Sequence, residues 1–574
     1  MYRSLREFLS ALDEAGELHR ITAKVSPMLE ISEIADRVSK SPAPSMSETA
    51  ARTDPRHHHL GGKALLFENV EGSSMPVAIN VFGSYRRMEM ALGCTDGGFE
   101  ALAARIEAIA KPEPPATFVD KLKKIPQLME IARTPPKIVS NAPCQQVVKT
   151  GNKVDLFELP MIKCWPLDGD PSAFGYPFEL QQPGEGRYIT FGGVHTIHPD
   201  DADKQPGTPR PSRNIGMYRA QLLDRNHTAM HWHVHHDGAR HWRAWKNVQQ
   251  ESGGNDSHAR GMPCAIALGG ESVLPYAATA PLPPGISEFM MAGLLNSGGI
   301  PITPCKTVPL EVPVNAEIVI EGWVSTQAGG PGVEGQQSQS LEAGHNTGLS
   351  TRNFPAFDSK HEHFEGPFGD HTGYYSLPDR YPVFEVTAIT HRTDPIYPTT
   401  IVGLPPQEDY YMGKATERIF LPLLQTLIPD IIDYDLPMFG AFHNCAFVQI
   451  RKEYALQARR VMHAIWGAGQ MAWTKMIVVV DDDVNVHDHE AVLFHLCANC
   501  DPGRDLEIVN GPLDILDHAA PHLGAGHKIG FDATRKIKGE EVAGHPIRDW
   551  PTVIQMDPQV RAFVDRRWGE YGFE

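Results

Sequence analysis

Short helical and strand patterns alternate along the first part of the chain. Apolar side chains recur at three- and four-residue spacing between Leu5 and Leu12, directly after Ser4 and Glu7, which form the pattern of a helix N-terminus. Two apolar runs are too short for helices and predict strands. The expected elements are helices over 5–12 and 27–38 and strands over 64–67 and 76–81. We therefore expect residues 1–125 to form a mixed α/β domain.

The pattern becomes rich in β-strands after about residue 140. Apolar and polar residues alternate over runs that Gly and Pro interrupt, as in a barrel or a sandwich. The clearest runs are 189–197, 316–324 and 383–389. We expect a second domain over 126–390.

Two polar segments interrupt these patterns. Residues 41–62 carry three consecutive histidines and predict a surface loop. Residues 324–363 are rich in Gly, Ser and Gln and predict a long loop. Because long loops inside a domain are often functional lids, we expect the second segment to shape or cover a binding pocket.

Helical and buried-strand patterns alternate again in a third domain, expected over 391–574. Apolar positions between Tyr454 and Ile465 share one helical face, and 476–480 is an apolar run typical of a buried strand. Three aspartates, 481–483, follow that strand. Carboxylates there either bind a metal or substrate or form a solvated turn before the next helix.

Composition and charge narrow the class of protein. The 574 residues exceed one hydrophobic core, which agrees with several domains. A net charge of -18 with dispersed Lys and Arg argues against nucleic acid as a partner. The sequence shows neither a secretory signal nor an apolar run long enough to span a membrane. We expect a cytoplasmic protein without stable membrane insertion.

Eight cysteines are few for this length and do not predict a disulfide framework. Cys497 and Cys500 form a CxxC pair, but a zinc ribbon needs a second pair, and none occurs. The sequence therefore predicts ordinary buried thiols at both positions.

Polar residues that could bind a ligand are concentrated in two nearby segments. These are 214–219, Asn-Ile-Gly-Met-Tyr-Arg, and 231–238, His-Trp-His-Val-His-His-Asp-Gly. If a strand continues through the histidines, alternation places His231, His233 and His235 on one face, a spacing that suits zinc. Such a site predicts a metal-dependent hydrolase that activates water. The alternative is a set of histidines lining a polar barrel face. The pattern alone leaves both open.

A second group spans 365–375, Glu-Gly-Pro-Phe-Gly-Asp-His-Thr-Gly-Tyr-Tyr. The Gly-Pro-Phe-Gly turn can bring Glu365 and Asp370 into one pocket, where burial and repulsion would leave an acid beside a base. A plain turn with solvated acids is the alternative.

Several separated motifs resemble the UbiD family and follow its order along the chain. These are 5–9 with 16–18, 64–69, 214–219, 283–293, 315–322, 365–375, 475–485 and 530–534. The resemblance implies a mixed α/β and β fold: a mixed N-terminal α/β domain, a central split β-barrel that binds flavin, and a C-terminal α/β domain that makes oligomer contacts. A homodimer or homohexamer is implied.

The resemblance also implies a cofactor, prenylated FMN, which a separate flavin prenyltransferase supplies. Its phosphate would be held through Mn2+ or Mg2+, with K+ nearby. The implied metal ligands are Asn214, His236 and Glu288, with His235 as the alternative to His236. An amide oxygen, an imidazole nitrogen and a carboxylate suit Mn2+ or Mg2+. The implied cofactor contacts are Asn214, Ile215, Met217, Tyr218, Arg219, His231, Trp232, His233, His236, Asp237 and Glu288. Gly216 is expected to let a flat ring or a phosphate approach the backbone.

Family chemistry implies non-oxidative decarboxylation of an aromatic, heteroaromatic or α,β-unsaturated acid, with reversal at high CO2 left open. In the family, the substrate forms a covalent adduct with the modified flavin, which acts as an electron sink while CO2 leaves. Asp370 matches the proton donor, Glu365 the second carboxylate, and Arg219 the cation that links them and orients the substrate. The implied substrate is a small carboxylic acid.

The chain departs from the ubiquinone-pathway enzyme at 41–62, 246–262 and 324–363, where it looks expanded. This leaves 3-polyprenyl-4-hydroxybenzoate decarboxylation as an alternative activity. A non-catalytic carboxylase subunit is a further alternative, which the presence of all three residues Arg219, Glu365 and Asp370 disfavours. Residues 407–409 and Lys414 either reach the substrate or form a surface turn.

Overall fold

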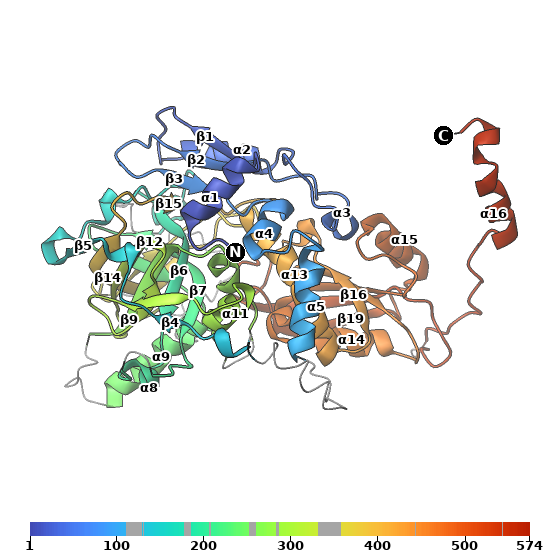
Figure 1. The fold of residues 1–574 in the computed structure, drawn as a ribbon. Helices are drawn as coiled ribbons and strands as arrows, with labels where there is room; N and C mark the ends of the chain where they lie inside the picture. The colour runs from blue at the N-terminus through green and yellow to red at the C-terminus, as the bar shows by residue number, and fades with distance from the viewer. Residues whose placement is uncertain are drawn as a thin grey trace.

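The computed structural model shows three packed regions and a separate C-terminal arm. In Figure 1 the N-terminal elements lie above a β-barrel, the C-terminal α/β domain lies beside the barrel, and the last helix stands apart from the rest. The structure describes residues 1–110, 129, 131–176, 185–205, 208–251, 260–282, 286–330, 358–441, 444–541 and 544–573.

The N-terminal region confirms the predicted helices and strands. Helix α1 (Leu5–Glu14) begins at Ser4, whose hydroxyl accepts a hydrogen bond from the Glu7 N–H at 3.3 Å, and its apolar face is buried. Four strands form one sheet in the order β1 (Leu18–Ile21), β2 (Ala64–Phe67), β3 (Val77–Ile79) and β15 (Tyr397–Pro398). The helices are α2 (Glu30–Ser39), α4 (Tyr85–Leu92) and α5 (Gly98–Ala110).

Residues 41–62 are mostly irregular and at least partly exposed, as the predicted surface loop would be, but Asp54 anchors the segment. They contain helix α3 (Ala50–Thr53), and Asp54 is buried. The hydroxyls of Tyr85 and Tyr410 donate hydrogen bonds to the Asp54 carboxylate at 2.8 and 2.7 Å. The burial of Asp54 was not predictable locally, because these two tyrosines come from distant parts of the chain.

Six antiparallel strands close into the predicted barrel. The pairing of its first and last strands, β12 with β14, completes the ring β12–β9–β6–β7–β8–β14. The strands are β6 (Tyr188–Thr196), β7 (Asn214–Leu222), β8 (His227–His231), β9 (Met262–Gly269), β12 (Ala316–Val324) and β14 (Asp379–His391). This confirms the three predicted strand runs and the mixed α/β and β fold class.

Smaller elements cover the barrel. Strand β13 (Glu362–Glu365) pairs with the start of β14, and β5 (Val147–Thr150) pairs with its end. A small separate sheet joins β4 (Lys137–Ile138), β10 (Pro301–Pro304) and β11 (Glu311–Pro313). The helices are α8 (Pro199–Ala202), α9 (Asp237–Glu251), α10 (Leu274–Ala277) and α11 (Glu288–Leu295). Most of the predicted lid, 331–357, and part of the 246–262 expansion lie outside the described residues.

The C-terminal domain has the predicted α/β character. Its sheet runs β16 (Ile431–Asp435), β17 (Cys445–Ile450), β18 (Met476–Val480), β20 (Ala525–Asp532) and β19 (Leu506–Pro512). Strands β17, β18 and β20 are parallel. The helices are α13 (Glu408–Leu427), α14 (Gln457–Trp466), α15 (His489–Asn499) and α16 (Pro558–Arg566). The apolar face of α14 is buried as predicted, although Tyr454 precedes the helix.

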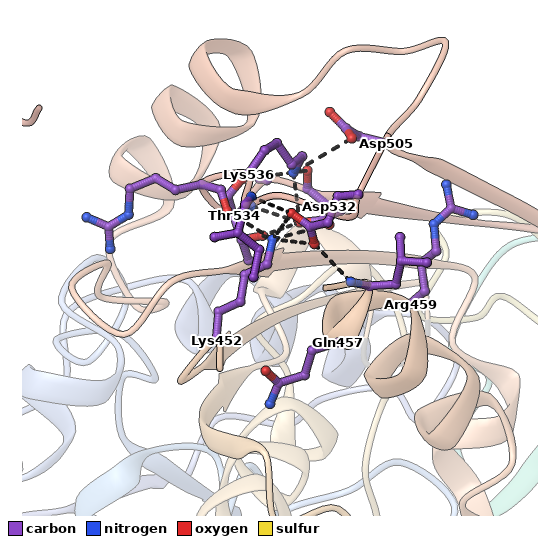
Figure 2. Close-up of polar contacts among 12 residues, drawn as sticks. Lys452, Gln457, Arg459, Asp505, Asp532, Thr534 and Lys536 are labelled. Carbon is purple, nitrogen blue, oxygen red and sulfur yellow. Dashed lines mark hydrogen bonds and ion pairs between the residues drawn. The ribbon is translucent and has the colours of Figure 1, made fainter. Parts of the chain in front are cut away.

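The three aspartates after β18 all make ion pairs, and Asp481 is buried whereas Asp482 and Asp483 are exposed. Buried Asp481 accepts hydrogen bonds from the Arg535 backbone and side chain at 2.8 and 3.1 Å. Figure 2 shows the neighbouring group, in which Lys536 lies 3.0 Å from Asp532. Lys452 donates to Thr534 at 2.7 Å. The lysines therefore neutralise the carboxyl edge of the parallel strands internally.

The eight cysteines are all unpaired thiols. Cys497 is exposed and Cys500 is partly buried, so the prediction that both are buried is wrong. None of the helices in the described part of the chain combines the length and the apolarity needed to cross a bilayer.

Candidate active site

The structure brings Arg219, Glu365 and Asp370 into direct contact. Arg219 lies on β7, Glu365 ends β13, and Asp370 follows in the next turn. The Arg219 Nε and Nη2 donate to the two Glu365 oxygens at 2.7 and 3.1 Å, and Nη1 donates to Asp370 Oδ2 at 3.0 Å. The two carboxylate side chains are only 1% and 5% exposed. A plain turn with solvated acids is therefore excluded.

The turn that carries Asp370 is fixed to the barrel by three side chains. Gln221 Oε1 accepts from the Gly366 N–H at 2.9 Å, and Asp168 Oδ1 accepts from the Gly369 N–H at 2.8 Å. The Trp165 ring lies so close to Gly369 that a Cβ there would be 2.1 Å from Trp165 Cδ1. Only glycine fits at 369 without a shift of the turn.

The cationic neighbours of Glu365 and Asp370 keep both buried carboxyl groups ionised. Burial would raise the pKa of Glu365, but Arg219 and His231 lower that pKa to about 2. His231 Nδ1 lies 2.7 Å from Glu365 Oε2. Burial would also raise the pKa of Asp370, but His371 and Arg219 hold it below its ordinary value. Both carboxyl groups are therefore ionised near neutral pH in this arrangement.

Arg219 retains capacity for one further partner. A guanidinium has five N–H donors, and in the described part of the chain four of them bind Glu365, Asp370 and the Ser376 hydroxyl. The Arg219 guanidinium also lies over the Phe368 ring, 4.4 Å from its centroid. One remaining N–H can therefore orient a carboxylate that enters the pocket.

Strand alternation does not place the histidines as the sequence predicted. Strand β8 ends at His231, and the chain then turns. His231 joins Glu365, whereas one ligand atom from each of His233, His235 and His236 lies within 4.8 Å of the others. No regular strand continues through these residues, so the predicted common face of His231, His233 and His235 does not form.

The predicted metal ligands come from three elements. Asn214 begins β7, and Glu288 begins α11 and accepts from the neighbouring Ile215 N–H at 2.7 Å. Asn214 Nδ2 donates to the Thr196 hydroxyl at 3.2 Å, and the His236 ring lies 5.1 Å from the ring of Tyr218 on β7. Burial raises the pKa of Glu288 to about 7, which an adjacent cation would reverse.

His236 is engaged within its own turn. Its Nδ1 accepts a hydrogen bond from the His233 N–H at 3.0 Å. A neutral ring whose Nδ1 accepts carries its proton on Nε2, so neither nitrogen is ready to bind a metal. Metal binding through His236 therefore requires the turn to give up this hydrogen bond. His235 is exposed, and its ring lies 4.5 Å from that of Trp473 in the C-terminal domain.

Two residues among the predicted cofactor contacts have a buried side-chain nitrogen without a hydrogen-bond partner. Within the described residues, Trp232 Nε1 and His233 Nε2 are buried and make no hydrogen bond. Such atoms fit a polar ligand such as a flavin. The expectation for Gly216 is wrong, because the Tyr218 ring fills the space above it and a Cβ there would be 2.2 Å from Tyr218 Cζ.

The other predicted contacts lie at the edges of this region. Ile215 and Met217 line a small cavity of about 20 Å³. Asp237 begins α9 and pairs with Arg240 at 2.7 Å.

Residues 407–409 and Lys414 do not form a surface turn. Glu408 accepts from the Asn80 and Phe82 N–H groups at 3.1 and 2.9 Å, and Lys414 binds Glu417 and Asp435 at 2.7 Å each. Gln407, Glu408 and Lys414 are buried. The partners of Glu408 lie more than 300 residues away, so local polarity suggested exposure.

Sequence reasoning gave no role to His371 or Asp168. His371 Nδ1 lies 2.9 Å from Asp370 Oδ1, and Asp168 holds the backbone beside Asp370. His371 could have been found from its position next to the predicted proton donor. Asp168 carries no such signal, because its contact depends on the fold.

Family models match most of the chain. A model described as the 3-octaprenyl-4-hydroxybenzoate carboxy-lyase Rift-related domain matches residues 137–405. The models of the corresponding C-terminal and N-terminal domains match 410–533 and 9–106. The chain belongs to the UbiD family of carboxy-lyases. This decides against the metal-dependent hydrolase.

Two relatives resemble the chain over nearly its full length. A protein of Aquifex aeolicus, described as uncharacterized, is 41% identical over 573 residues, which cover 100% of this chain and 99% of the relative. A similarly described protein of Archaeoglobus fulgidus is 41% identical over 570 residues, covering 99% and 98%.

Two solved structures share the fold of this chain. The closed form of vanillic acid decarboxylase from Sedimentibacter hydroxybenzoicus has a TM-score of 0.72 and 21% identity, and the match covers 100% of this chain and 99% of that one. The evolved dimeric form of HmfF from Pelotomaculum thermopropionicum, in complex with prFMN, has a TM-score of 0.65 and 23% identity, with 94% and 96% covered.

Proposed function

We propose that this UbiD protein decarboxylates an aromatic, heteroaromatic or α,β-unsaturated carboxylic acid with prenylated FMN, without net oxidation. The buried contact of Arg219 with Glu365 and Asp370 carries the proposal. The prFMN in the HmfF structure supports the choice of cofactor. A flavin prenyltransferase would supply the cofactor.

The cofactor would be held by residues around the β7 strand and the histidine turn. Asn214, Glu288 and either His235 or His236 would bind Mn2+ or Mg2+, which suits their amide, carboxylate and imidazole donors, with K+ nearby. Buried Trp232 Nε1 and His233 Nε2 would contact the flavin. When bound, prenylated FMN supplies an electron sink for the departure of CO2.

Arg219, Glu365 and Asp370, here called the triad, would position the substrate and deliver a proton to it. The remaining N–H of Arg219 would orient the substrate carboxylate, with Glu365 fixing the guanidinium plane. Asp370 would deliver the proton that replaces CO2 on the substrate carbon. Burial of the two carboxylates excludes water from this exchange.

The decisive test replaces Glu365 by Gln in protein produced together with a flavin prenyltransferase. We expect Glu365→Gln to lower turnover at least roughly 100-fold, because it removes a charge that fixes Arg219, while a flavin chromophore and manganese remain bound. Absorbance, metal analysis and CO2 release measure these quantities. Unchanged turnover in this variant would refute the assignment.

A matched control lies on the same strand. Glu362 is buried and pairs with Arg380 at 2.8 Å, outside the triad. Glu362→Gln should therefore keep turnover close to that of the unaltered protein.

The substrate is tested with a panel of acids. Vanillate and 3,4-dihydroxybenzoate are included because structural neighbours are described as decarboxylases of these acids. A 3-polyprenyl-4-hydroxybenzoate is included because the family model is described by a related activity. The preferred acid is the one with the highest kcat/KM. We also propose a homodimer or homohexamer as the working assembly.

A further inference from the structure

A buried histidine lies against the predicted proton donor. His371 Nδ1 is 2.9 Å from Asp370 Oδ1, and the His371 backbone N–H donates to the same oxygen at 2.8 Å. The other oxygen of Asp370, Oδ2, accepts from Arg219 at 3.0 Å. The His371 side chain is only 12% exposed. Asp370 therefore lies between a permanent cation and a group that can gain or lose a proton.

Acidic groups from two further elements face His371. Asp409 lies in the first turn of α13, and Asp514 follows β19 in the C-terminal domain. Both carboxyl groups act electrostatically on the imidazole. The neighbouring Tyr374 ring lies 4.1 Å from the ring of His518, which also belongs to the C-terminal domain. His371 is thus surrounded by residues of three parts of the chain: the turn that carries Asp370, here called the catalytic turn, helix α13 and the C-terminal domain.

These charges decide where the proton lies. Burial would lower the pKa of His371, but Asp370, Asp409 and Asp514 raise it to about 9. The pKa of Asp370 stays below its ordinary value. Near neutral pH the proton of the pair is therefore on His371, and Asp370 alone has none to give.

We propose that His371 supplies through Asp370 the proton that replaces CO2 on the substrate. This inference rests on the proposed decarboxylation. The carbon–carbon bond to the carboxylate breaks as CO2 leaves, and the electron pair of that bond ends in the new C–H bond that the substrate carbon forms with the Asp370 proton. His371 gives its proton to Asp370 and regains one from water, so the net change is a carboxylate and a proton giving a C–H bond and CO2. His371 acts through Asp370 and is a positioning residue.

The variant His371→Gln separates this role from a structural one. The glutamine amide can still donate a hydrogen bond to Asp370, but it cannot titrate. A purely structural role predicts nearly unchanged kcat. A proton-supplying role predicts that kcat falls roughly 100-fold while KM changes little.

The pH profile provides the discriminating measurement. The His371 imidazole carries the transferable proton only below its pKa, so kcat should be maximal near neutral pH and fall as pH rises through about 9. The alkaline fall should be absent in His371→Gln and should move to lower pH in Asp514→Asn, which removes one facing charge. An alkaline fall that stays in place in both variants overturns the proposal.

A second readout does not need turnover. Protein labelled at the histidine Cε1 gives NMR signals for its imidazoles, and the signal missing from His371→Gln identifies His371. We expect it to titrate above pH 8 and to titrate at lower pH in Asp514→Asn. A midpoint at or below the ordinary histidine value of about 6.5 overturns the inference even if His371→Gln loses activity. If no acid in the panel is decarboxylated, the proposed function fails, and this titration still decides the protonation of His371.

Discussion

At the scale of single residues, the site depends on one arginine that satisfies two buried carboxylates at once. Four of its donors bind Glu365, Asp370 and Ser376 in a fixed plane. Lysine has the same charge, but it lacks the planar arrangement of donors. The geometry of the site should therefore depend on the guanidinium as well as on its charge.

The variant Arg219→Lys tests this dependence. We expect kcat/KM to fall roughly 100-fold, because one ammonium cannot hold both carboxylates in position. Steady-state kinetics with the best acid of the panel measures the change. The control is Arg380→Lys, which alters an arginine that pairs with Glu362 outside the triad. An equal loss in both variants would show that the effect is not specific to the site.

At the scale of elements, the catalytic turn is held between the barrel and one aromatic ring. Gly369 leaves space for Trp165, whose indole N–H donates to the Val402 carbonyl at 2.7 Å. The ring is therefore anchored and cannot easily move aside. A side chain at 369 would instead displace the turn that carries Asp370.

The variant Gly369→Ala should thus lose both activity and stability. Overpacking of this kind costs about 1–3 kcal/mol of unfolding free energy, and displacement of Asp370 should lower kcat by roughly 100-fold. Thermal unfolding and CO2 release measure the two effects. Gly298→Ala is the control, since a Cβ at Gly298 meets nothing within 4 Å. Full activity in Gly369→Ala would mean that the turn tolerates the displacement.

The elements themselves were largely predictable from the sequence, whereas their contacts were not. Periodicity gave α1, β2, β12 and β18 nearly to the residue, because each buries one regular face or a whole apolar run. Family motifs gave the contact of Arg219 with Glu365 and Asp370. Polar residues that become buried only in the assembled fold were misjudged, as Glu408 and Lys414 show. Their burial follows from the assembled fold and leaves no local pattern.

At the scale of the whole molecule, contacts within one chain do not explain why the C-terminal arm carries exposed apolar side chains. Helix α16 stands apart from the domains in Figure 1. It and the residues around it expose large apolar side chains, with Ile554 99% exposed and Phe563 47%. Exposed apolar groups of this kind mark interaction surfaces. Val560 and Phe563 lie three residues apart on α16 (Pro558–Arg566), so they would present one face to a partner.

A second copy of the chain is the partner that agrees with the proposed homodimer or homohexamer, since a symmetric pair can exchange such arms reciprocally. Phe563→Glu should therefore lower the oligomeric mass in light scattering after size-exclusion chromatography, because burying the new carboxylate opposes docking. Gln559→Glu adds the same charge to this exposed helix outside its apolar positions and should leave the mass unchanged. Dissociation should become more complete on dilution, since association depends on protein concentration. An unchanged mass for Phe563→Glu at all concentrations would contradict docking of the arm on a second copy.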